Sequence, residues 1–412
     1  MKTLSIISRF LQAGSLPHIR CGLILVASAI FVPAVYAVSP DEVALQILTQ
    51  SPETLKGVAQ VSVLGEELRS VSNLPDPEVE GEYLVAPAGE TNRWGAGISW
   101  GLEWPGVYSA RRAAADGQLN VAMAEMMVSR NETLTEIQNY LLDYIFASSQ
   151  LKMLKEIQAA NDSVSLLAER SFKGGEVTRL DLGKLRIERA SIAARIAEVE
   201  TSLMEAKASL SELNGSDCSS LLEGLDTQLP HAVVPTRQDI DNALAASPEV
   251  VAAYRRLEQA RLEGKVAARE GLPNLTIGYN HAFEDGIHFN GASLGISIPM
   301  FSNRGKKHAA KVKETVAEAE LEMARNQVGL TLEDGVARLN RMNARIEDLS
   351  KAIDSTDDMA LLSKAYSGGL ITLIDYINER NYFLEARFSL LDLRYNAAKL
   401  RLTLHSLLPR NL

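Results

Sequence analysis

The sequence predicts an α+β fold built from one unit that occurs twice, in which a two-stranded β-hairpin precedes a very long helix. Two stretches 194 residues apart share one pattern: an aromatic residue, then glycine, threonine and aspartate, each three residues after the last. These residues are Phe172, Gly175, Thr178 and Asp181 in the first stretch, and Tyr366, Gly369, Thr372 and Asp375 in the second. Glycine closes helix C-termini because it adopts positive φ, and Thr-x-x-Asp resembles a capping box. Each stretch therefore predicts a tight helix–turn–helix reversal, and the recurrence predicts a duplication.

Residues 1–37 have the features of a secretory signal peptide. Lys2, Arg9 and Arg20 precede an apolar run over 21–32, and 35–37 form a small-x-small cleavage pattern. A retained membrane anchor is the alternative, which the shortness of the apolar run disfavours. Cleavage removes three positive charges and no acids, so the formal net charge moves from −10 to −13. An acidic exported protein is a poor nucleic-acid binder, so no nucleic-acid partner is expected.

The first repeat is expected over 38–215, and its elements follow from local signals. In order they are a helix over 40–74, a β-hairpin over 77–104, a long helix over about 107–171, a tip at 172–178 and a returning helix over 178–213. Ser39 and Pro40 favour a helix start, and residues of the hairpin alternate with period two. Apolar residues of the long helix recur at spacings of three, four and seven residues, which is typical of coiled coils.

A stretch over 216–236 holds no strong period and is interpreted as a linker. The second repeat, 237–412, is expected to retrace the first. Its elements are a helix over 237–271, a hairpin over 273–300, a long helix over about 304–366, a tip at 366–372 and a final helix from 372 to about 407.

The three tryptophans, Trp94, Trp100 and Trp104, share one face of the second strand of the first hairpin. The first and last are ten residues apart, which is about 33 Å along a strand. Tilted by about 40°, this strand spans about 25 Å, the height of the lipid-facing band of an outer-membrane barrel. Tryptophan favours membrane–water interfaces, so these residues are candidate interface aromatics. The buried face of a soluble sheet is the alternative.

Four strands from one chain cannot close a barrel around water, and an open sheet in lipid leaves unsatisfied edges. Three copies would supply twelve strands, an even number within the known range. Small or polar residues occupy the inward phase of the strands, which predicts an open lumen. Three copies would thus give a twelve-stranded barrel that the long helices continue as a tube about 100 Å long.

The signal peptide, the duplicated hairpin and coiled-coil unit and the paired reversals together resemble the TolC-like outer-membrane efflux protein family. The resemblance covers nearly all of the mature chain. It implies a homotrimeric channel-tunnel, with a twelve-stranded barrel in the lipid of the bacterial outer membrane and an α-helical barrel that extends through the periplasm. It also implies two partners: a periplasmic adaptor (membrane fusion) protein and an inner-membrane pump of the resistance-nodulation-division type. The cargo would be metal ions, as in the cobalt–zinc–cadmium systems, or small toxic compounds.

The resemblance also implies roles for particular residues. The adaptor would dock at the tips, on Phe172, Gly175, Thr178, Tyr366, Gly369 and Thr372. Relatives carry acids inside the second reversal that ring a closed entrance, and Asp375 matches such a position. A second acid can occur one turn later, where this chain has Asn378; Asp181 is the equivalent of Asp375 in the first repeat. Many relatives carry a lipid on an N-terminal cysteine, but this mature chain would begin at Val38, so no lipid is expected.

No catalytic motif, cofactor or metal site is predicted. His281 and His288 flank the second hairpin turn, and two histidines seven residues apart are interpreted as exposed loop residues. Helix capping alone is the alternative role of Asp181 and Asp375. Two other functions remain open at this point: a type I protein-secretion duct of the same architecture, and a periplasmic coiled-coil scaffold whose hairpins are soluble sheets.

Overall fold

A computed structural model describes residues 38–87, 92–175, 177–299, 303–356 and 359–409 of the 412-residue chain. The signal peptide expected at 1–37 lies outside these residues. The described residues belong to one compact unit that starts at Ala37. The boundaries expected for the two repeats stay a prediction.

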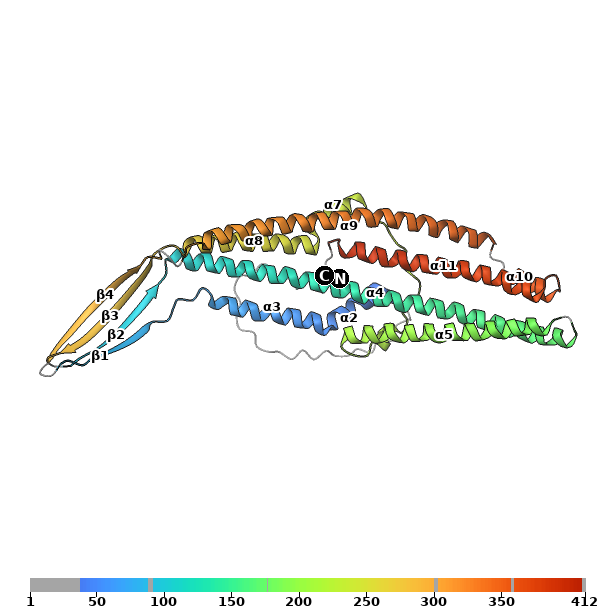
Figure 1. The fold of residues 1–412 in the computed structure, drawn as a ribbon, viewed down its shortest axis with the longest axis horizontal. Coiled ribbons are helices and arrows are strands. Elements are labelled where there is room, and N and C mark those ends of the chain that lie inside the picture. The colour runs from blue at the N-terminus through green and yellow to red at the C-terminus, as the bar shows by residue number, and fades with distance from the viewer. Residues whose placement is uncertain (1–37, 88–91, 176, 300–302, 357–358, 410–412) are drawn as a thin grey trace, which may run out of the picture. The chain divides into compact units, whose positions relative to one another are not determined.

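Helices and strands follow each other in the order expected for a duplicated unit (Figure 1). The elements of the first half are α2 (Pro40–Gln50), α3 (Pro52–Ser70), β1 (Glu78–Leu84), β2 (Arg93–Leu102), α4 (Pro105–Lys173), α5 (Arg179–Asn214) and α6 (Ser219–Leu222). Those of the second half are α7 (Arg237–Ala246), α8 (Pro248–Arg269), β3 (Asn274–Glu284), β4 (Ile287–Ser297), α9 (Lys306–Thr356), α10 (Met359–Ser367) and α11 (Leu373–Ser406).

The single helix expected before each hairpin is in fact two helices. The breaks fall at the same dipeptide, Ser51-Pro52 and Ser247-Pro248. A residue before proline is pushed out of the α region, and both serines are extended, with ψ of 125° and 149°. Proline then occupies the first position of the new helix, where its missing N–H costs no hydrogen bond. This signal was present in the sequence and was missed.

The long helices pack side by side in antiparallel pairs. Helix α4 contacts α5, α8 and α11, and α9 contacts α8 and α11 (Figure 1). The apolar seam expected on α4 is confirmed, because Leu134, Ile137 and Leu141 are buried against α2. The other long helix is described as α9 and α10, and residues 357–358 between them lie outside the described residues.

The stretch interpreted as a linker packs against the helices. Cys218, Leu222 and Leu225 are buried together with residues of α2 and α4, and Ala232 is buried against α7, α8 and α9. A parallel bridge also pairs Val38 with Leu225. The segment thus joins the cores of both halves, although it has no period that a sequence search could detect.

Within the described residues, the four strands form one antiparallel sheet in the order β1-β2-β3-β4 (Figure 1). The register places small and acidic residues on one face. Examples aligned across all four strands are Glu78, Ser99, Gly278 and Ser293. The other face is apolar, and Trp100, Ile277 and Leu294 are aligned on it. The alternation in the sequence therefore predicted correctly which residues share each face of the sheet.

The second strand was expected to continue to Trp104, which is too far. Strand β2 ends at Leu102, and Trp104 is the N-cap of α4. Proline at the first helical position favours a helix start there. Trp94 stays on the apolar face of β2 and is exposed, as is Trp104, while the indole N–H of Trp100 donates to the carbonyl of Pro75 over 2.7 Å.

A four-residue ionic network ties the sheet to the helices of both halves. Arg111 of α4 donates to both carboxylate oxygens of Glu103, at 2.6 and 2.8 Å, and to Glu270 at 3.2 Å. Lys306 donates to the other oxygen of Glu270 over 2.9 Å. The hydrogen bond from Lys306 is the main cause that holds the pKa of Glu270 below its ordinary value of 4.5. Glu270 thereby joins the ends of α4, α8 and α9.

We expect Glu270→Gln to lower the free energy of unfolding by about 1.5 kcal/mol at pH 7, the value of a hydrogen bond to a charged group. Because the folded-state pKa is depressed, this contribution is present above pH 4.5 and is lost as the pH falls through the folded-state pKa. The difference from wild type should therefore shrink in acid. Denaturant titrations of the purified protein at several pH values measure it. Glu347→Gln is the control, because the Glu347–Lys351 pair is exposed and should contribute little.

Candidate functional site

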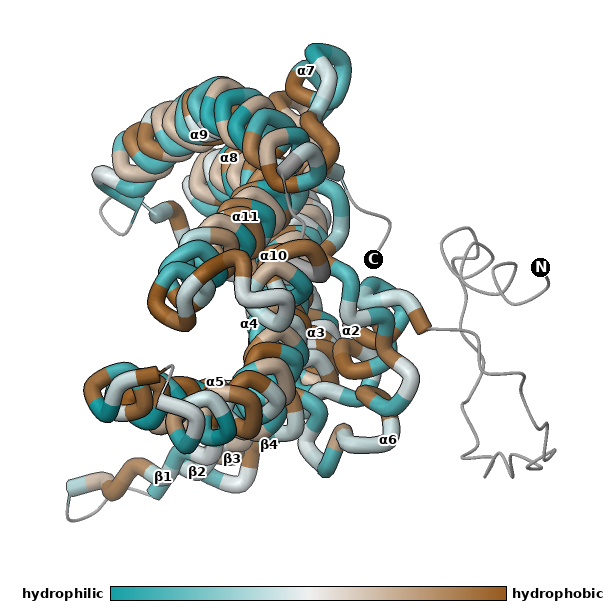
Figure 2. The backbone as a smooth tube through the Cα atoms, turned by 90° about the vertical axis from the view of Figure 1, so that its right-hand side faces the viewer, coloured by the Kyte–Doolittle hydropathy of each residue, from teal (hydrophilic) through white to brown (hydrophobic). Residues whose placement is uncertain are grey.

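The two reversals lie at the same end of the helical bundle and pack on each other. One joins α4 to α5, and the other joins α10 to α11 (Figure 1). Val164, Leu185, Leu373 and Tyr376 are buried together at this end, so all of α4, α5 and α11 contribute to one apolar cluster. Figure 2 is viewed from this end and shows hydrophobic and hydrophilic bands alternating along these helices.

The second reversal is a Schellman motif that ends at glycine. Gly369 has a φ of +70°, and its N–H donates to the carbonyl of Tyr366 over 3.0 Å. The N–H of Leu370 donates to the carbonyl of Ala365 over 2.9 Å, which gives the two bonds that define this helix end. The first reversal matches it where it is described, because Gly175 has a φ of +81° and its N–H donates to Phe172 over 3.0 Å.

A complete capping box starts the helix after each reversal. The N–H of Thr372 donates to the Asp375 carboxylate over 3.2 Å, and the N–H of Asp375 donates to the Thr372 hydroxyl over 3.1 Å. Thr178 and Asp181 repeat both bonds, at 3.2 Å each. The hydrogen bond from the Thr178 hydroxyl is the main cause that lowers the pKa of Asp181. The capping role expected for both aspartates is confirmed.

A groove of about 630 Å³ separates the two tips. It is bounded by Leu167 and Asp181 on one side and by Tyr366, Gly369 and Thr372 on the other. The aromatic residues of the two tips differ in environment. Tyr366 packs against Tyr376, with ring centroids 5.3 Å apart, whereas Phe172 is 42% exposed.

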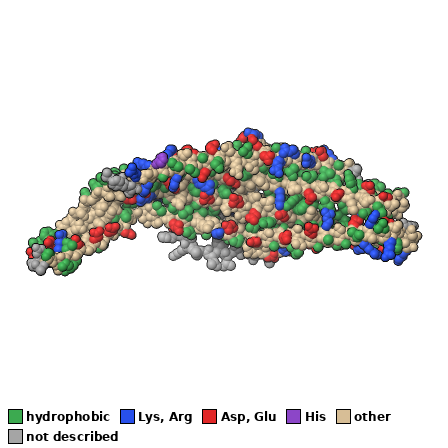
Figure 3. Space-filling view, viewed as in Figure 1, with side chains coloured by type: hydrophobic (Ala, Val, Ile, Leu, Met, Phe, Trp, Pro, Cys, Tyr) green, Lys and Arg blue, Asp and Glu red, His purple; other side chains and the backbone are tan. Residues whose placement is uncertain are grey.

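The first tip carries a concentration of basic side chains, visible as blue atoms at the right-hand end of Figure 3. Arg170, Lys173, Arg179 and Lys184 are exposed there. The described part of the second tip has Lys364 in the last turn of α10 and the exposed Asp375 in the first turn of α11. The two tips therefore share backbone geometry but differ in charge.

The residues expected at an entrance lie along the first turns of α5 and α11. Asp375 and Asn378 are exposed on α11, and Asp181 is half-buried on α5. Asn378 borders a separate groove of about 520 Å³, together with Glu188 and Arg195 of α5. The structure therefore leaves Asp375 and Asn378 free of the apolar cluster that holds the tips together.

Sequence reasoning missed Arg380, which is fully buried where three helices meet. Its guanidinium, on α11, donates to the Asn161 side chain of α4 and to the Glu188 carboxylate of α5, and lies 5.6 Å from the centroid of the Tyr376 ring. Burial lowers the pKa of Arg380 to about 10. An arginine in the buried stripe that starts with Leu373 and Tyr376 was the signal that could have revealed it.

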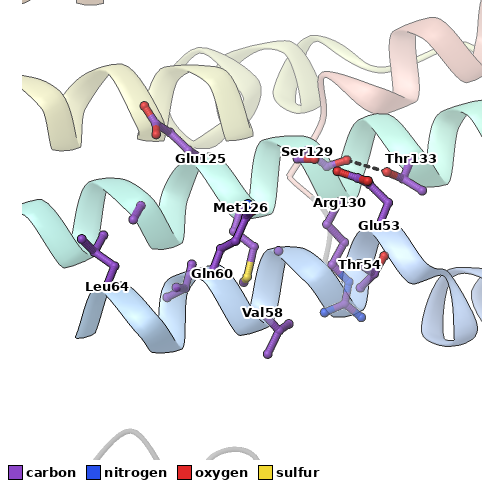
Figure 4. A pocket seen from close by; sticks show the side chains of 13 residues that line it. Glu53, Thr54, Val58, Gln60, Leu64, Glu125, Met126, Ser129, Arg130 and Thr133 are labelled. Atoms are coloured by element: carbon purple, nitrogen blue, oxygen red, sulfur yellow. Dashed lines mark hydrogen bonds between the residues drawn. The ribbon is translucent and has the colours of Figure 1, made fainter. Parts of the chain in front are cut away.

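Elsewhere, the described residues form further grooves, including one of about 630 Å³ between the sheet and the helices, lined in part by Trp104 and Pro273. No group of three or more His, Cys, Asp or Glu side chains within them is placed to hold a metal ion. A shallow groove of about 290 Å³ lies between α3 and α4, where Figure 4 shows Met126 and Arg130 of α4 reaching toward α3. The helices of the described segments also include none with the length and apolarity of a membrane span.

Comparison with known proteins gives one curated relative and several similar structures. No protein-family model matches the sequence. The cobalt-zinc-cadmium resistance protein CzcC of Cupriavidus metallidurans is 21% identical over 343 residues, or 82% of each chain. The crystal structure of CusC, described in terms of transmembrane channel formation, has a TM-score of 0.72 at 16% identity and covers 90% of this chain and 92% of that one. The open state of the MtrE outer membrane channel of Neisseria gonorrhoeae has a TM-score of 0.73 at 14% identity, with 96% and 98% covered.

The fold is that of the TolC-like outer-membrane channels. The resemblance stated from the reversals and the duplicated hairpins is confirmed, as is the fold class of hairpin strands continued by long helices. The similar structures span nearly the whole chain, so the likeness includes the sheet, the helices and the tips together.

We expect Arg380→Met to lower the free energy of unfolding by about 3 kcal/mol, because it leaves the Glu188 carboxylate partly buried without its cation. The double variant Arg380→Met/Glu188→Leu should recover most of this loss, since it removes both charges. Arg186 is the matched control: it is the equivalent residue of the first repeat, 194 positions earlier, and it is exposed. Arg186→Met should change stability little. Equal effects of the two single variants, in denaturant unfolding, would contradict the assignment of the buried network.

Proposed function

We propose that this protein is the outer-membrane channel of a tripartite efflux system. It receives substrate from an inner-membrane pump through a periplasmic adaptor and conducts it passively to the exterior. It carries out no chemical reaction, and the proteins it resembles in structure are channels. The chain works as a homotrimer, with its strands in the outer membrane and its long helices in the periplasm.

The observation that carries this proposal is the sheet, which has two chemically different faces and two open edges. Strands β1 and β4 have one neighbour each among the described strands. The backbone N–H and C=O groups on the outer side of each therefore have no strand partner there. In a bilayer these groups must be hydrogen-bonded within protein, which requires a closed barrel. The face with Leu294 and Ile296, which are exposed in the single chain, suits lipid. The face with Glu78 and Ser99 suits a water-filled lumen.

The substrate class rests on the curated relative. CzcC is named for resistance to cobalt, zinc and cadmium, and we infer that this channel exports divalent metal ions. The pump in this proposal is of the resistance-nodulation-division type, as the resemblance to the efflux family implies. The groove between the tips, lined in part by Tyr366 and Thr372, is the docking site for the adaptor, and the exposed basic residues of the first tip favour an adaptor segment with acidic residues.

Asp375 and Asn378 are the entrance residues in this proposal. Three copies of Asp375 around a three-fold axis would form a ring of like charge at the end where the helices reverse. Such a ring attracts cations and repels anions, which suits a channel for metal cations. The capping role of Asp375 is compatible with this, because one carboxylate oxygen accepts from Thr372 and the side chain is exposed.

Two measurements on the mature protein test the function. Extraction from the outer membrane and mass measurement in mild detergent should give a trimer, and planar bilayers containing it should conduct ions. Deletion of the gene should raise cellular sensitivity to cobalt, zinc or cadmium, and the wild-type gene should restore tolerance. A water-soluble chain that never conducts would overturn the channel. Conduction without any change in metal tolerance would overturn only the substrate class.

We expect Asp375→Asn to reduce cation selectivity in planar bilayers. The amide oxygen can still accept the N–H of Thr372, so the cap is largely kept while the charge is removed. Asp181→Asn, the same change at the equivalent cap of the first repeat, is the control and should alter selectivity less. Identical selectivity of wild type and Asp375→Asn would mean that Asp375 only caps its helix and has no role at the entrance.

We expect Gly369→Ala to weaken capture of the adaptor while the trimer persists. An added methyl group would meet no atom within 4 Å, but the φ of +70° is unfavourable for alanine by about 1 kcal/mol, so the turn should shift. Gly183→Ala is the control, because Gly183 lies on α5 in equally open space without a positive φ. Co-purification with the adaptor measures the effect, and unchanged capture by Gly369→Ala would contradict docking at this turn.

A further inference from the structure

His281 and His288 lie inside strands and not in a loop as expected. His281 belongs to β3 and is opposite Asn290, while His288 belongs to β4 and is opposite Phe283. Both therefore occupy the apolar face of the sheet, as diagonal neighbours close to the turn at Asp285 and Gly286. The pairing of β3 with β4 brings the two histidines together. Their spacing of seven residues along the chain did not indicate this contact.

The two imidazoles face each other through one nitrogen each. Nδ1 of His288 and Nε2 of His281 are 3.4 Å apart, while the ring centroids are 5.3 Å apart, so these nitrogens are on the facing sides of the rings. This separation is longer than the range of about 2.7–3.2 Å typical of protein N–H hydrogen bonds. Two nitrogens bound to one tetrahedral ion at about 2.0–2.1 Å would be about 3.3–3.4 Å apart. The spacing therefore suits a shared ion as well as a long hydrogen bond between the two rings.

A chain of hydrogen bonds fixes which nitrogen of His281 is free to bind an ion. Nδ1 of His281 is 2.7 Å from the side-chain oxygen of Asn290, and the Tyr279 hydroxyl donates to that same oxygen over 2.8 Å. An amide oxygen only accepts, so Nδ1 of His281 carries the hydrogen and Nε2 of the neutral ring presents a lone pair. Histidines that bind metals typically donate their other ring N–H in this way.

Neighbouring aromatic rings limit the movement of both imidazoles. The Trp94 ring lies 5.6 Å from that of His281, and the Phe283 ring lies 4.8 Å from that of His288, between centroids. His288 is exposed and His281 is half-buried. The pair is thus held in place. It lies next to the hairpin turn, at the end of the face proposed to meet lipid, where an ion can reach it from solvent and water can fill its remaining coordination positions.

We propose that His281 and His288 form a binding site for one divalent cation of the class that prefers imidazole, such as Zn²⁺, Cu²⁺ or Ni²⁺. Oxygen-preferring ions such as Mg²⁺ are excluded by the ligands. The bound ion cross-links β3 to β4 next to their turn. The site depends only on contacts within this hairpin, so it is independent of the proposed efflux function and of the substrate that passes through the channel.

Calorimetric titration of the full-length mature protein in detergent with Zn²⁺ tests the site. Wild type should show one saturable binding event per chain, and His281→Asn and His288→Asn should each weaken it at least tenfold. His308→Asn is the matched control, because His308 is an exposed histidine in the first turn of α9, outside the hairpin, and it should bind as wild type does. Equal binding by wild type and both hairpin variants would overturn the site, as would a titration with no saturable event.

Two further readouts separate metal binding from a structural role of the histidines. Asn290→Leu should weaken Zn²⁺ binding several-fold, because it removes the oxygen that holds the hydrogen on Nδ1 of His281 and so keeps Nε2 free for the ion. Asn290→Asp, which keeps an acceptor oxygen, should retain binding. Hydrogen exchange of the backbone amides of 281–288 should slow when Zn²⁺ is added to wild type and stay unchanged in His288→Asn. Exchange that is equally fast with and without Zn²⁺ in wild type would overturn the cross-link between the strands.

Discussion

Backbone hydrogen bonding in lipid is the constraint on which the proposed membrane channel depends. The described residues of one chain supply four paired strands, and the outer edges of β1 and β4 have no strand partner among them. In the proposed trimer these edges pair with other copies. An edge that faces hydrocarbon is not tolerated, because no water is present to satisfy its N–H and C=O groups. The alternation of Gly and Ser with Leu, Ile and Trp is the side-chain counterpart, since each strand of such a channel presents one face to lipid and the other to water. Helices need no such partner, because their backbone is satisfied internally.

The sequence was most informative where a local rule decides the structure. Glycine at 175 and 369 and the Thr-x-x-Asp motifs that follow them determine the reversals within a few residues, and both formed as expected. Local rules also existed for the breaks at Ser51 and Ser247, but the apolar period on either side concealed them. By contrast, the position of Arg380 and the contact between His281 and His288 depend on packing or register between separate elements, which no single stretch of sequence contains.

The duplication has produced two halves with the same backbone plan and different interiors. Arg186 and Arg380 occupy equivalent positions after their capping boxes, yet the first is exposed and the second is buried. Leu182 stands where the second half has Tyr376, the residue that packs against Tyr366. The capping geometry is kept in both halves because every reversal needs it, whereas side chains one turn later are free to differ. The tip that results is asymmetric in charge and in packing.

The buried contacts of Arg380 have a consequence for how the protein is made. Its partners, Asn161 and Glu188, lie on other helices of the same chain, so these buried contacts need no second copy. By contrast, β1 and β4 each have only one strand neighbour within the described residues. In the trimeric channel proposed above, one copy could therefore form its helical contacts alone, whereas closure of the barrel needs two other copies. For such a channel we expect the helical end to form before the barrel, with the unpaired strand edges as the part most exposed to aggregation.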